Sequence, residues 1–160
     1  MSSAIFILTL ATALGSGLVA GFFFGVSTFL MPVLGRLPAA QGIAVMQAIN
    51  VRVINPWFMT ALFGTALACI AVIVAALANL DDSFAPYLLA GGVIYVVATI
   101  GLTMAYNVPR NDALAALDPG TAEAARYWAR YLAEWTPANH VRGAAALLAC
   151  GLQIAAIHLG

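Results

Sequence analysis

The chain has 160 residues, of which 8% are charged and 64% are hydrophobic; six Arg and six acidic residues give a formal net charge of zero. Soluble domains carry about 25% charged residues, so this chain has too few to solvate a globular surface. The composition therefore excludes a soluble enzyme, a disordered chain and a nucleic-acid binder, which needs a basic excess. The length fits one domain over residues 1–160, and the mean hydropathy of +1.00 indicates an integral membrane protein.

Four long stretches carry no Asp, Glu, Lys or Arg: Ala4–Gly35, Val53–Leu80, Ser83–Pro109 and Gly143–Gly160. A membrane-spanning helix needs about 20 mainly apolar residues, and lipid offers no partner to unpaired backbone groups, so each stretch is expected to be helical. The predicted spans cover residues 5–31, 57–78, 85–106 and 139–158. The predicted fold class is an all-α membrane protein, a bundle of four transmembrane helices with amphipathic helices in the two long connections.

The connections between these spans differ in length and charge. Residues 32–55 and 107–138 form long connections, whereas residues 79–84 form a tight turn that contains Asp81 and Asp82. An even number of spans puts both termini on the side of the short turn, and all six arginines fall toward the other side. The positive-inside rule then predicts cytoplasmic long connections and external termini, in a plasma membrane of the bacterial type.

Prolines suggest where the spans begin and end. Asn55-Pro56 has the pattern of an N-cap followed by a first-turn proline, and Thr136-Pro137 has the same pattern before the last span. Pro109 does not easily continue a helix, so the third span is expected to end near Asn107.

Two helices are predicted in the long connections. Over residues 121–135, Tyr127, Tyr131 and Trp135 recur every four residues and so share one helix face. Such a helix is typical of the lipid headgroup layer, and it serves either as an interfacial anchor or as a lid over a pocket. Residues 39–53 form a weaker second candidate.

Small residues form stripes on the first and last spans, namely Ala13, Gly17, Gly21 and Gly25, and then Gly143, Gly151 and Ala155. In lipid, small residues allow helices to approach closely. We expect the stripes to pack within the bundle, with a homo-oligomer contact as the alternative.

Cys69 and Cys150 are expected at similar depth. Buried free cysteines usually behave as small hydrophobic side chains, and a bridged or metal-binding pair is the alternative. No zinc, haem-attachment or nucleotide-binding motif is present, so no metal site is predicted.

Polar residues gather where the predicted spans meet the long connections, and the ones relevant to a site are Asn50, Asn107, Asn111, Asn139, His140 and Arg142. They are either solvated helix ends or the lining of one wet cavity between the helices. We expect the last five of them to lie close together at that end of the bundle. An arginine near a helix N-terminus gains nothing from the helix dipole, so a carboxylate, a set of carbonyls or a bound anionic oxygen is expected to compensate Arg142. Asp112 and Glu134 are the nearest carboxylates in sequence.

Three stretches resemble the DUF1772 family of small four-span membrane proteins, which includes anthrone oxygenases. They are Phe24–Pro32 with Arg36-Leu37-Pro38, then Gly42–Asn55, and then Asn107–Asp112 followed by Trp135 and Asn139–Arg142. They occur in the order of the family and span nearly the whole chain. The family usually places an aromatic residue just before the Asn of the last motif, where this chain has Ala138.

The resemblance implies an oxidoreductase that converts a lipophilic aromatic or quinone-like substrate, as anthrone oxygenases convert anthrones, without a classical cofactor. Such a site needs a base, donors for an enolate oxygen and an apolar slot. From residue chemistry, His140 is the expected base, Arg142, Asn107 and Asn139 are the expected donors, and flat rings are expected beside Trp135, Tyr106 or Trp57. The alternative is a non-enzymatic bundle that binds a lipid or quinone-like ligand, or a partner subunit.

Overall fold

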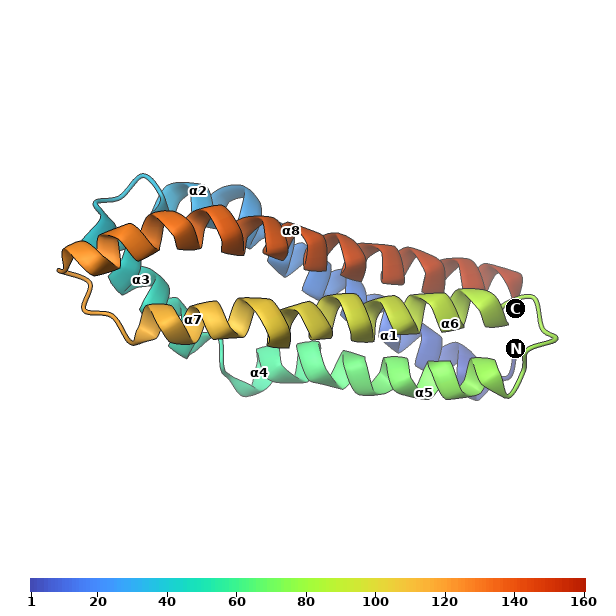
Figure 1. Ribbon diagram of the computed structural model, residues 1–160. Helices are drawn as coiled ribbons and strands as arrows, with labels where there is room; N and C mark the ends of the chain where they lie inside the picture. The colour runs from blue at the N-terminus through green and yellow to red at the C-terminus, as the bar shows by residue number, and fades with distance from the viewer.

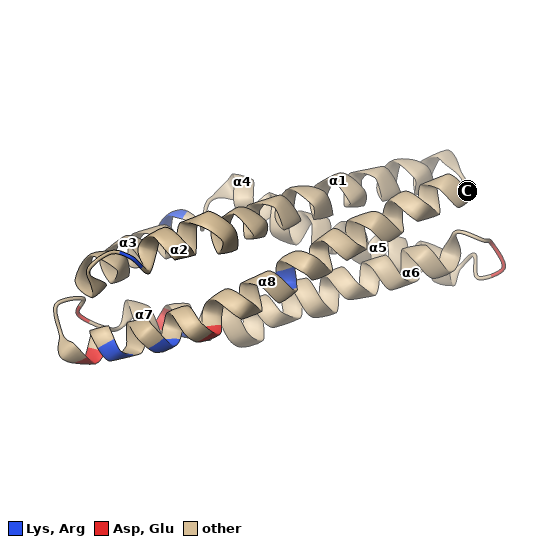
Figure 2. Ribbon diagram, turned by 90° about the horizontal axis from the view of Figure 1, so that it is seen from above, with Lys and Arg blue, Asp and Glu red and all other residues tan.

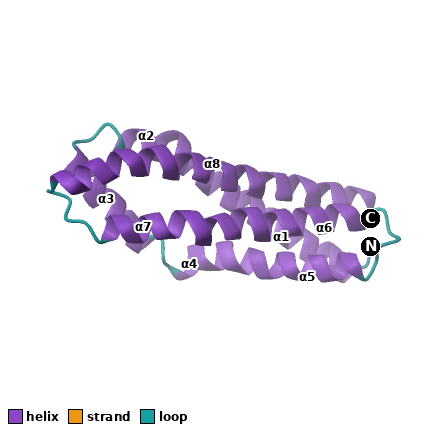
Figure 3. Ribbon diagram, viewed as in Figure 1, coloured by secondary structure: helices purple, strands orange, loops and turns teal.

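The computed structural model describes all 160 residues, and its regular structure is entirely helical (Figure 3). Four helices are long and apolar enough to cross a membrane: span 1 (Ser3–Leu34), span 2 (Pro56–Leu77), span 3 (Ala85–Ala115) and span 4 (Ala122–Leu159). This confirms the predicted all-α, four-span membrane fold.

Three of the four spans contain π-helical turns. Span 1 comprises α1 (Ser3–Gly25), η1 (Val26–Leu30) and α2 (Met31–Leu34), and span 2 comprises α4 (Pro56–Met59), η2 (Thr60–Gly64) and α5 (Thr65–Leu77). Span 3 comprises α6 (Ala85–Ile94), η3 (Tyr95–Gly101), η4 (Thr103–Asn107) and α7 (Val108–Ala115). Span 4 is the single helix α8 (Ala122–Leu159), and α3 (Ala39–Arg52) lies between spans 1 and 2. π-turns are rare and frequently accompany functional sites. The π-turns of spans 1, 2 and 3 therefore indicate that a functional site lies near them.

Both termini lie at one end of the bundle, beside the short turn between α5 and α6 (Figure 1). The amino group of Met1 donates to the Gly160 carbonyl at 3.1 Å, and the Ser83 hydroxyl donates to the Leu159 carbonyl at 2.9 Å. Basic residues gather toward the opposite end, whereas the short turn carries acidic ones (Figure 2). We name the two ends the terminal end and the cap end.

The cap is formed by α2, α3, α7 and residues 122–135 of α8. With 38 residues, α8 is about 57 Å long at 1.5 Å per residue, so it is much longer than the roughly 30 Å hydrocarbon core of a bilayer. The cap has an apolar core of its own, made by Met31, Leu34, Ile43, Met46, Leu114, Trp128, Tyr131 and Trp135. The three aromatic rings of α8 stack in order, with centroid distances of 5.5 Å and 5.8 Å.

The expected helix ends at the two prolines are wrong, since both helices continue through them. Pro137 lies inside α8 and has no N–H to donate to the carbonyl of Ala133, four residues earlier. Both residues are exposed, so the unpaired carbonyl lies at the protein surface. Pro109 follows η4 directly within span 3, and Met104 and Ala105, whose carbonyls a donor at residue 109 would reach, are exposed.

The helix over residues 121–135 is expected from its sequence to present its aromatic face to the lipid headgroups, and this expectation is also wrong. These residues are helical, but they form the first part of α8, and Trp128, Tyr131 and Trp135 are buried in the cap core. The aromatic face therefore packs against protein, because α2, α3 and α7 cover it.

The close helix contacts differ from the predicted stripe. Gly21 is exposed, and a Cβ atom there would meet nothing within 4 Å. A Cβ atom at Gly15 would overlap the Thr65 hydroxyl and also lie 3.1 Å from Thr65 Cβ. A Cβ atom at Gly143 would lie 3.2 Å from Phe23 Cβ, whereas one at Gly151 would meet nothing. Ala13 is buried, and a Cβ atom at Gly17 would lie 3.4 Å from Cys150 Sγ of α8. The stripes therefore pack within the bundle at Ala13, Gly17 and Gly143 but not at Gly21 or Gly151, and Gly15 adds a tight contact of α1 with span 2.

We predict that Gly15→Ala destabilises the bundle by about 1–3 kcal/mol, because Thr65 cannot clear the new methyl group by rotating its hydroxyl alone. Gly21→Ala is the matched control on the same helix and is expected to change little. Thermal unfolding in one detergent measures both. Equal melting temperatures for the two variants would contradict the contact between α1 and span 2.

Candidate functional site

The cap end of the bundle contains a cavity of about 590 Å³, within the range of small-molecule sites. Its walls come from spans 1, 2 and 3, from α3 and from α8, and most of its lining is apolar. The polar side chains that line it are Gln47, Asn50, Thr103, Asn111, Asp112 and Arg142. An apolar slot with a few polar groups is typical of a site for a lipophilic ligand.

Arg142 is the only cationic side chain lining the cavity, and it is 6% exposed. Its Nε and Nη2 atoms donate to Asn139 Oδ1 at 2.8 Å and 2.6 Å, and Nη1 donates to Thr103 Oγ1 at 3.1 Å. The guanidinium carbon lies 4.0 Å from the ring centroid of Phe23 and 5.1 Å from that of Trp135. Cation–π contacts strengthen when they are desolvated, so these rings help to hold the charge in place.

Neighbouring hydrogen bonds fix the two acceptors of Arg142. Asn139 is fully buried, and its Nδ2 donates to the Phe23 carbonyl at 2.8 Å and to Ser27 Oγ at 2.5 Å. Because the amide nitrogen must face that carbonyl, its oxygen faces Arg142. Thr103 gives its own proton to the Thr99 carbonyl at 2.6 Å, which leaves its oxygen free to accept. Arg142 is therefore held in one orientation by spans 1 and 3.

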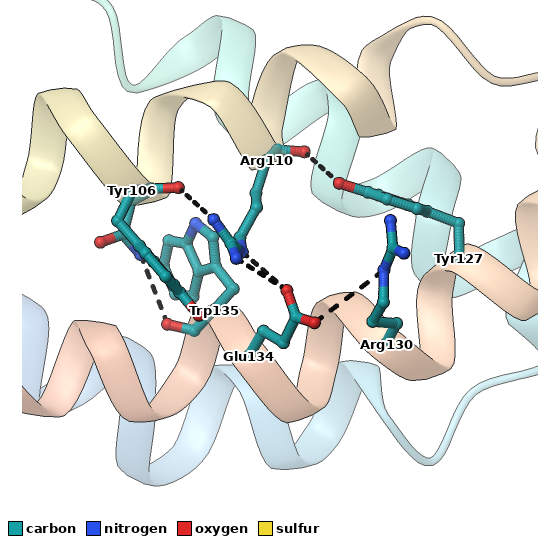
Figure 4. A network of polar contacts seen from close by, with 7 residues as sticks. Tyr106, Arg110, Tyr127, Arg130, Glu134 and Trp135 are labelled. Atoms are coloured by element: carbon teal, nitrogen blue, oxygen red, sulfur yellow. Dashed lines mark hydrogen bonds and ion pairs between the residues drawn. The ribbon is translucent and has the colours of Figure 1, made fainter.

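No carboxylate neutralises Arg142, so the expectation that Asp112 or Glu134 pairs with it is wrong. Glu134 is engaged on the outer face of α8, where it lies 2.8 Å from Arg110 Nη2 and 4.0 Å from Arg130 Nε (Figure 4). Asp112 lines the cavity but is exposed and forms no ion pair. Arg142 also lies well inside α8 rather than at a helix N-terminus. An ionisable group within a membrane-spanning helix is costly and usually functional.

Three further polar atoms in this region are buried without a partner: Asn50 Nδ2, Asn107 Oδ1 and Trp135 Nε1. Asn50 and Trp135 line the cavity, and Asn107 donates to the Trp135 carbonyl at 3.3 Å. Asn111 also lines the cavity and accepts from the Tyr131 hydroxyl at 2.8 Å. Unpaired buried polar atoms are uncommon, and all three in this chain adjoin the same cavity or its wall.

Three residues expected at the site lie elsewhere. His140 is exposed and lines a separate groove of about 360 Å³ between α1 and α8, together with Asn139, Gly21 and Gly143. It follows Asn139 on α8, and the turn of the helix points it away from the cavity. Trp57 is 88% exposed at the start of span 2. Tyr106 faces outward, where its ring lies 3.4 Å from the Arg110 guanidinium carbon (Figure 4).

The structure adds residues that the sequence reasoning missed, of which Thr103 and Phe23 matter most. Thr99, Thr103 and Asn107 recur every four residues along an otherwise apolar span, and this polar line is a signal that could have been found. Phe23 gave no such signal, because it is one of three consecutive phenylalanines.

The two cysteines lie apart from this site. Both are free, and Cys69 Sγ accepts from Gln153 Nε2 at 3.5 Å. Nowhere in the chain do three His, Cys, Asp or Glu side chains come close enough to share a metal ion.

Residues 54–152 match the family described as anthrone oxygenase. The chain belongs to the anthrone oxygenase family. The match confirms the family resemblance found from the sequence motifs. The matched residues include four members of the site, namely Thr103, Asn107, Asn139 and Arg142. Span 1 and α3, which supply Phe23 and Asn50, lie outside the matched residues. No curated protein and no solved structure matches the chain.

We predict that Asn139→Leu destabilises the protein by about 1–3 kcal/mol, because it removes the acceptor of the Arg142 Nε and Nη2 groups and the donor to the buried Ser27 hydroxyl, and leaves Arg142 with Thr103 alone. His140→Leu, one residue along, is the matched control and should leave stability unchanged. Chemical or thermal unfolding in detergent measures both variants. Similar losses for the two would mean that Asn139 does not hold Arg142 inside the bundle.

Proposed function

We propose that this protein is a membrane oxidoreductase that converts a lipophilic anthrone-like aromatic to the corresponding quinone within the cap-end cavity. The observation that carries this proposal is the Arg142 guanidinium, buried beside an apolar slot with no carboxylate to neutralise it. A fixed positive charge in a water-poor site stabilises negative charge that develops on a ligand oxygen. Membership of the anthrone oxygenase family supports the same substrate class.

The cavity suits a flat ring system with one oxygen directed toward α8. Trp135 and the apolar side chains of Met46 and Val26 line it, and Phe23 lies under the guanidinium. A planar ligand held among these side chains places its carbonyl oxygen toward Arg142. Asn107 Oδ1 and Trp135 Nε1 are unpaired nearby. After small side-chain rotations, a hydroxyl of the ligand donates to the Asn107 oxygen and a further ligand oxygen accepts from the Trp135 N–H.

The reaction starts with loss of a proton from the methylene carbon between the two aromatic rings of the anthrone. The electron pair moves to the carbonyl oxygen, and Arg142 stabilises the resulting enolate. Dioxygen, the co-reactant, takes electrons from the enolate and bonds to the same carbon, forming a hydroperoxide after proton return. Cleavage of the O–O bond with loss of the remaining hydrogen on that carbon gives the quinone. One anthrone and one dioxygen thus yield one anthraquinone and one water.

The proton requires an acceptor, and Asp112 is the only carboxylate that lines the cavity. It is exposed, so it can pass the proton on to bulk water. His140 has no part in this scheme, because it faces the groove on the other side of α8.

We predict that purified protein in lipid nanodiscs oxidises an anthrone with one dioxygen consumed per quinone formed. Arg142→Gln is expected to lower kcat by about 10²–10³-fold, because a charged donor to the enolate oxygen is lost. Asn139→Asp is expected to lower kcat by a similar factor, since a carboxylate beside the guanidinium neutralises its positive charge. His140→Gln is the control and should keep wild-type activity.

The second candidate function is a membrane bundle that binds a quinone-like ligand or lipid without converting it. The position of Asp112 at the exposed lip, rather than beside Arg142, favours this candidate. Retention of a hydroxyanthraquinone that depends on Arg142, with no oxidation of any anthrone above the rate in empty nanodiscs, would replace the enzyme by this binding function.

We further propose that the cap end faces the cytoplasm of a bacterial-type plasma membrane and that both termini lie outside. The arginines gathered toward the cap end support this orientation. Reporter fusions in the short turn at Asp81 and in the α7–α8 connection at Asp118 should report the outside and the cytoplasm, respectively. The reverse pair of results would overturn the orientation, and two results on one side would overturn the four-span topology.

A further inference from the structure

The exposed rim of the cavity varies in chemistry. Val51 and Ile54, near the start of span 2, form one exposed apolar part of it, and two further parts, which we call lips, lie elsewhere. One lip is polar and lies on α7, where Asn111 and the exposed Asp112 line the cavity. The other lip is apolar and lies between spans 2 and 3, where Phe63 is 38% exposed and Met104 is 51% exposed. Phe63 and Met104 lie within the membrane-capable helices, whereas Asp112 lies in the last turn of span 3, so we expect lipid beside the two apolar side chains and water beside Asp112.

Spans 2 and 3 are joined from the terminal end as far as Leu62, next to Phe63, and separate from there toward the cap end. The only hydrogen bond between them is donated by the Tyr95 hydroxyl to the Leu62 carbonyl, at 3.1 Å. Leu62 and Tyr95 also belong to one buried cluster with Cys69, which closes the bundle there. Figure 2 shows α4 set well apart from α7 at the cap end. On the other side of span 2, Phe58 packs on Phe22 with a centroid distance of 4.5 Å, so span 2 stays attached to span 1.

We propose that the lip between Phe63 and Met104 is a lateral portal through which a flat, lipophilic molecule with an ionisable oxygen passes directly from the bilayer to Arg142. This inference rests on the proposed function for the ligand class, and it adds the route. The guanidinium at the inner end of the cavity supplies the complementary charge. The polar lip at Asp112 then serves water and protons, so ligand and proton use different openings.

If the ligand passes through the apolar lip, a larger side chain there slows both the binding and the release of the ligand without changing its Kd. Met104→Trp and Phe63→Trp narrow the apolar lip, whereas Ala115→Trp places the same bulk on α7 beside the polar lip. Val97→Trp, on the lipid-exposed surface of span 3 away from the cavity, controls for the added tryptophan. A dihydroxyanthraquinone dissolved in nanodisc lipid is the probe, because its visible band moves when an oxygen ionises beside a cation. No oxidation is needed for this readout.

Rapid mixing of loaded and empty nanodiscs should show binding and release each slowed by about tenfold or more in Met104→Trp and Phe63→Trp, with an unchanged Kd. Ala115→Trp and Val97→Trp should match the wild type. Slowing by Ala115→Trp alone, or equal rates in all variants, would overturn the portal, and so would a wild-type protein that produces no band shift. A wild-type protein that binds the probe through the apolar lip but oxidises no anthrone would leave the portal standing and remove the proposed oxidation.

Discussion

The buried guanidinium of Arg142 is the constraint on which the rest of this structure depends. A charge within a membrane-spanning helix is tolerated only where protein groups replace water, and here they come from three spans. Asn139 supplies one acceptor and is itself held by Phe23 and Ser27 of span 1, while Thr103 of span 3 supplies the other. The bundle is thus assembled around a cation that has hydrogen-bond acceptors but no counter-charge, which leaves its charge available to a ligand.

The π-turns and the cap follow from the same requirement. The turns η1, η3 and η4 contain Ser27, Thr99 and Thr103, the residues that hold Arg142 directly or through one partner. A π-turn shifts the face that a helix presents, so polar groups in a lipid-exposed helix can be turned inward locally. The cap then covers the widened end of the bundle with the stacked rings of Trp128, Tyr131 and Trp135.

Much of the architecture was predictable because charge is excluded from lipid. The gaps between charged residues placed all four spans, and the Asn55-Pro56 signal gave the start of span 2, where Asn55 caps the helix. The ends at Pro109 and Pro137 failed, because tertiary packing of the cap keeps both helices continuous where local propensity favours a break. The predicted stripe on span 1 packs at Ala13 and Gly17 but not at Gly21, because four-residue spacing defines a helix face without saying how much of that face is covered.

Part of the site was also predictable, because polar residues are rare in membrane-spanning helices and stand out in the sequence. Arg142, Asn139, Asn107, Asn111, Asn50 and Trp135 were found as polar or aromatic residues near span ends, and they adjoin one cavity. His140 was misplaced because one residue along a helix is a rotation of about 100°, which the sequence cannot relate to a cavity. Phe23 and the lip residues Phe63 and Met104 are apolar residues in apolar spans, so only the tertiary structure distinguishes them.

The most direct test of the central claim is an experimental structure of the protein in lipid with a dihydroxyanthraquinone bound. The account predicts the ligand in the cap-end cavity, beside Trp135, with one oxygen about 3 Å from the Arg142 guanidinium and with Asn139 still bonded to that guanidinium. A ligand seated in the groove beside His140, or an Arg142 side chain turned out to pair with a carboxylate, would contradict it.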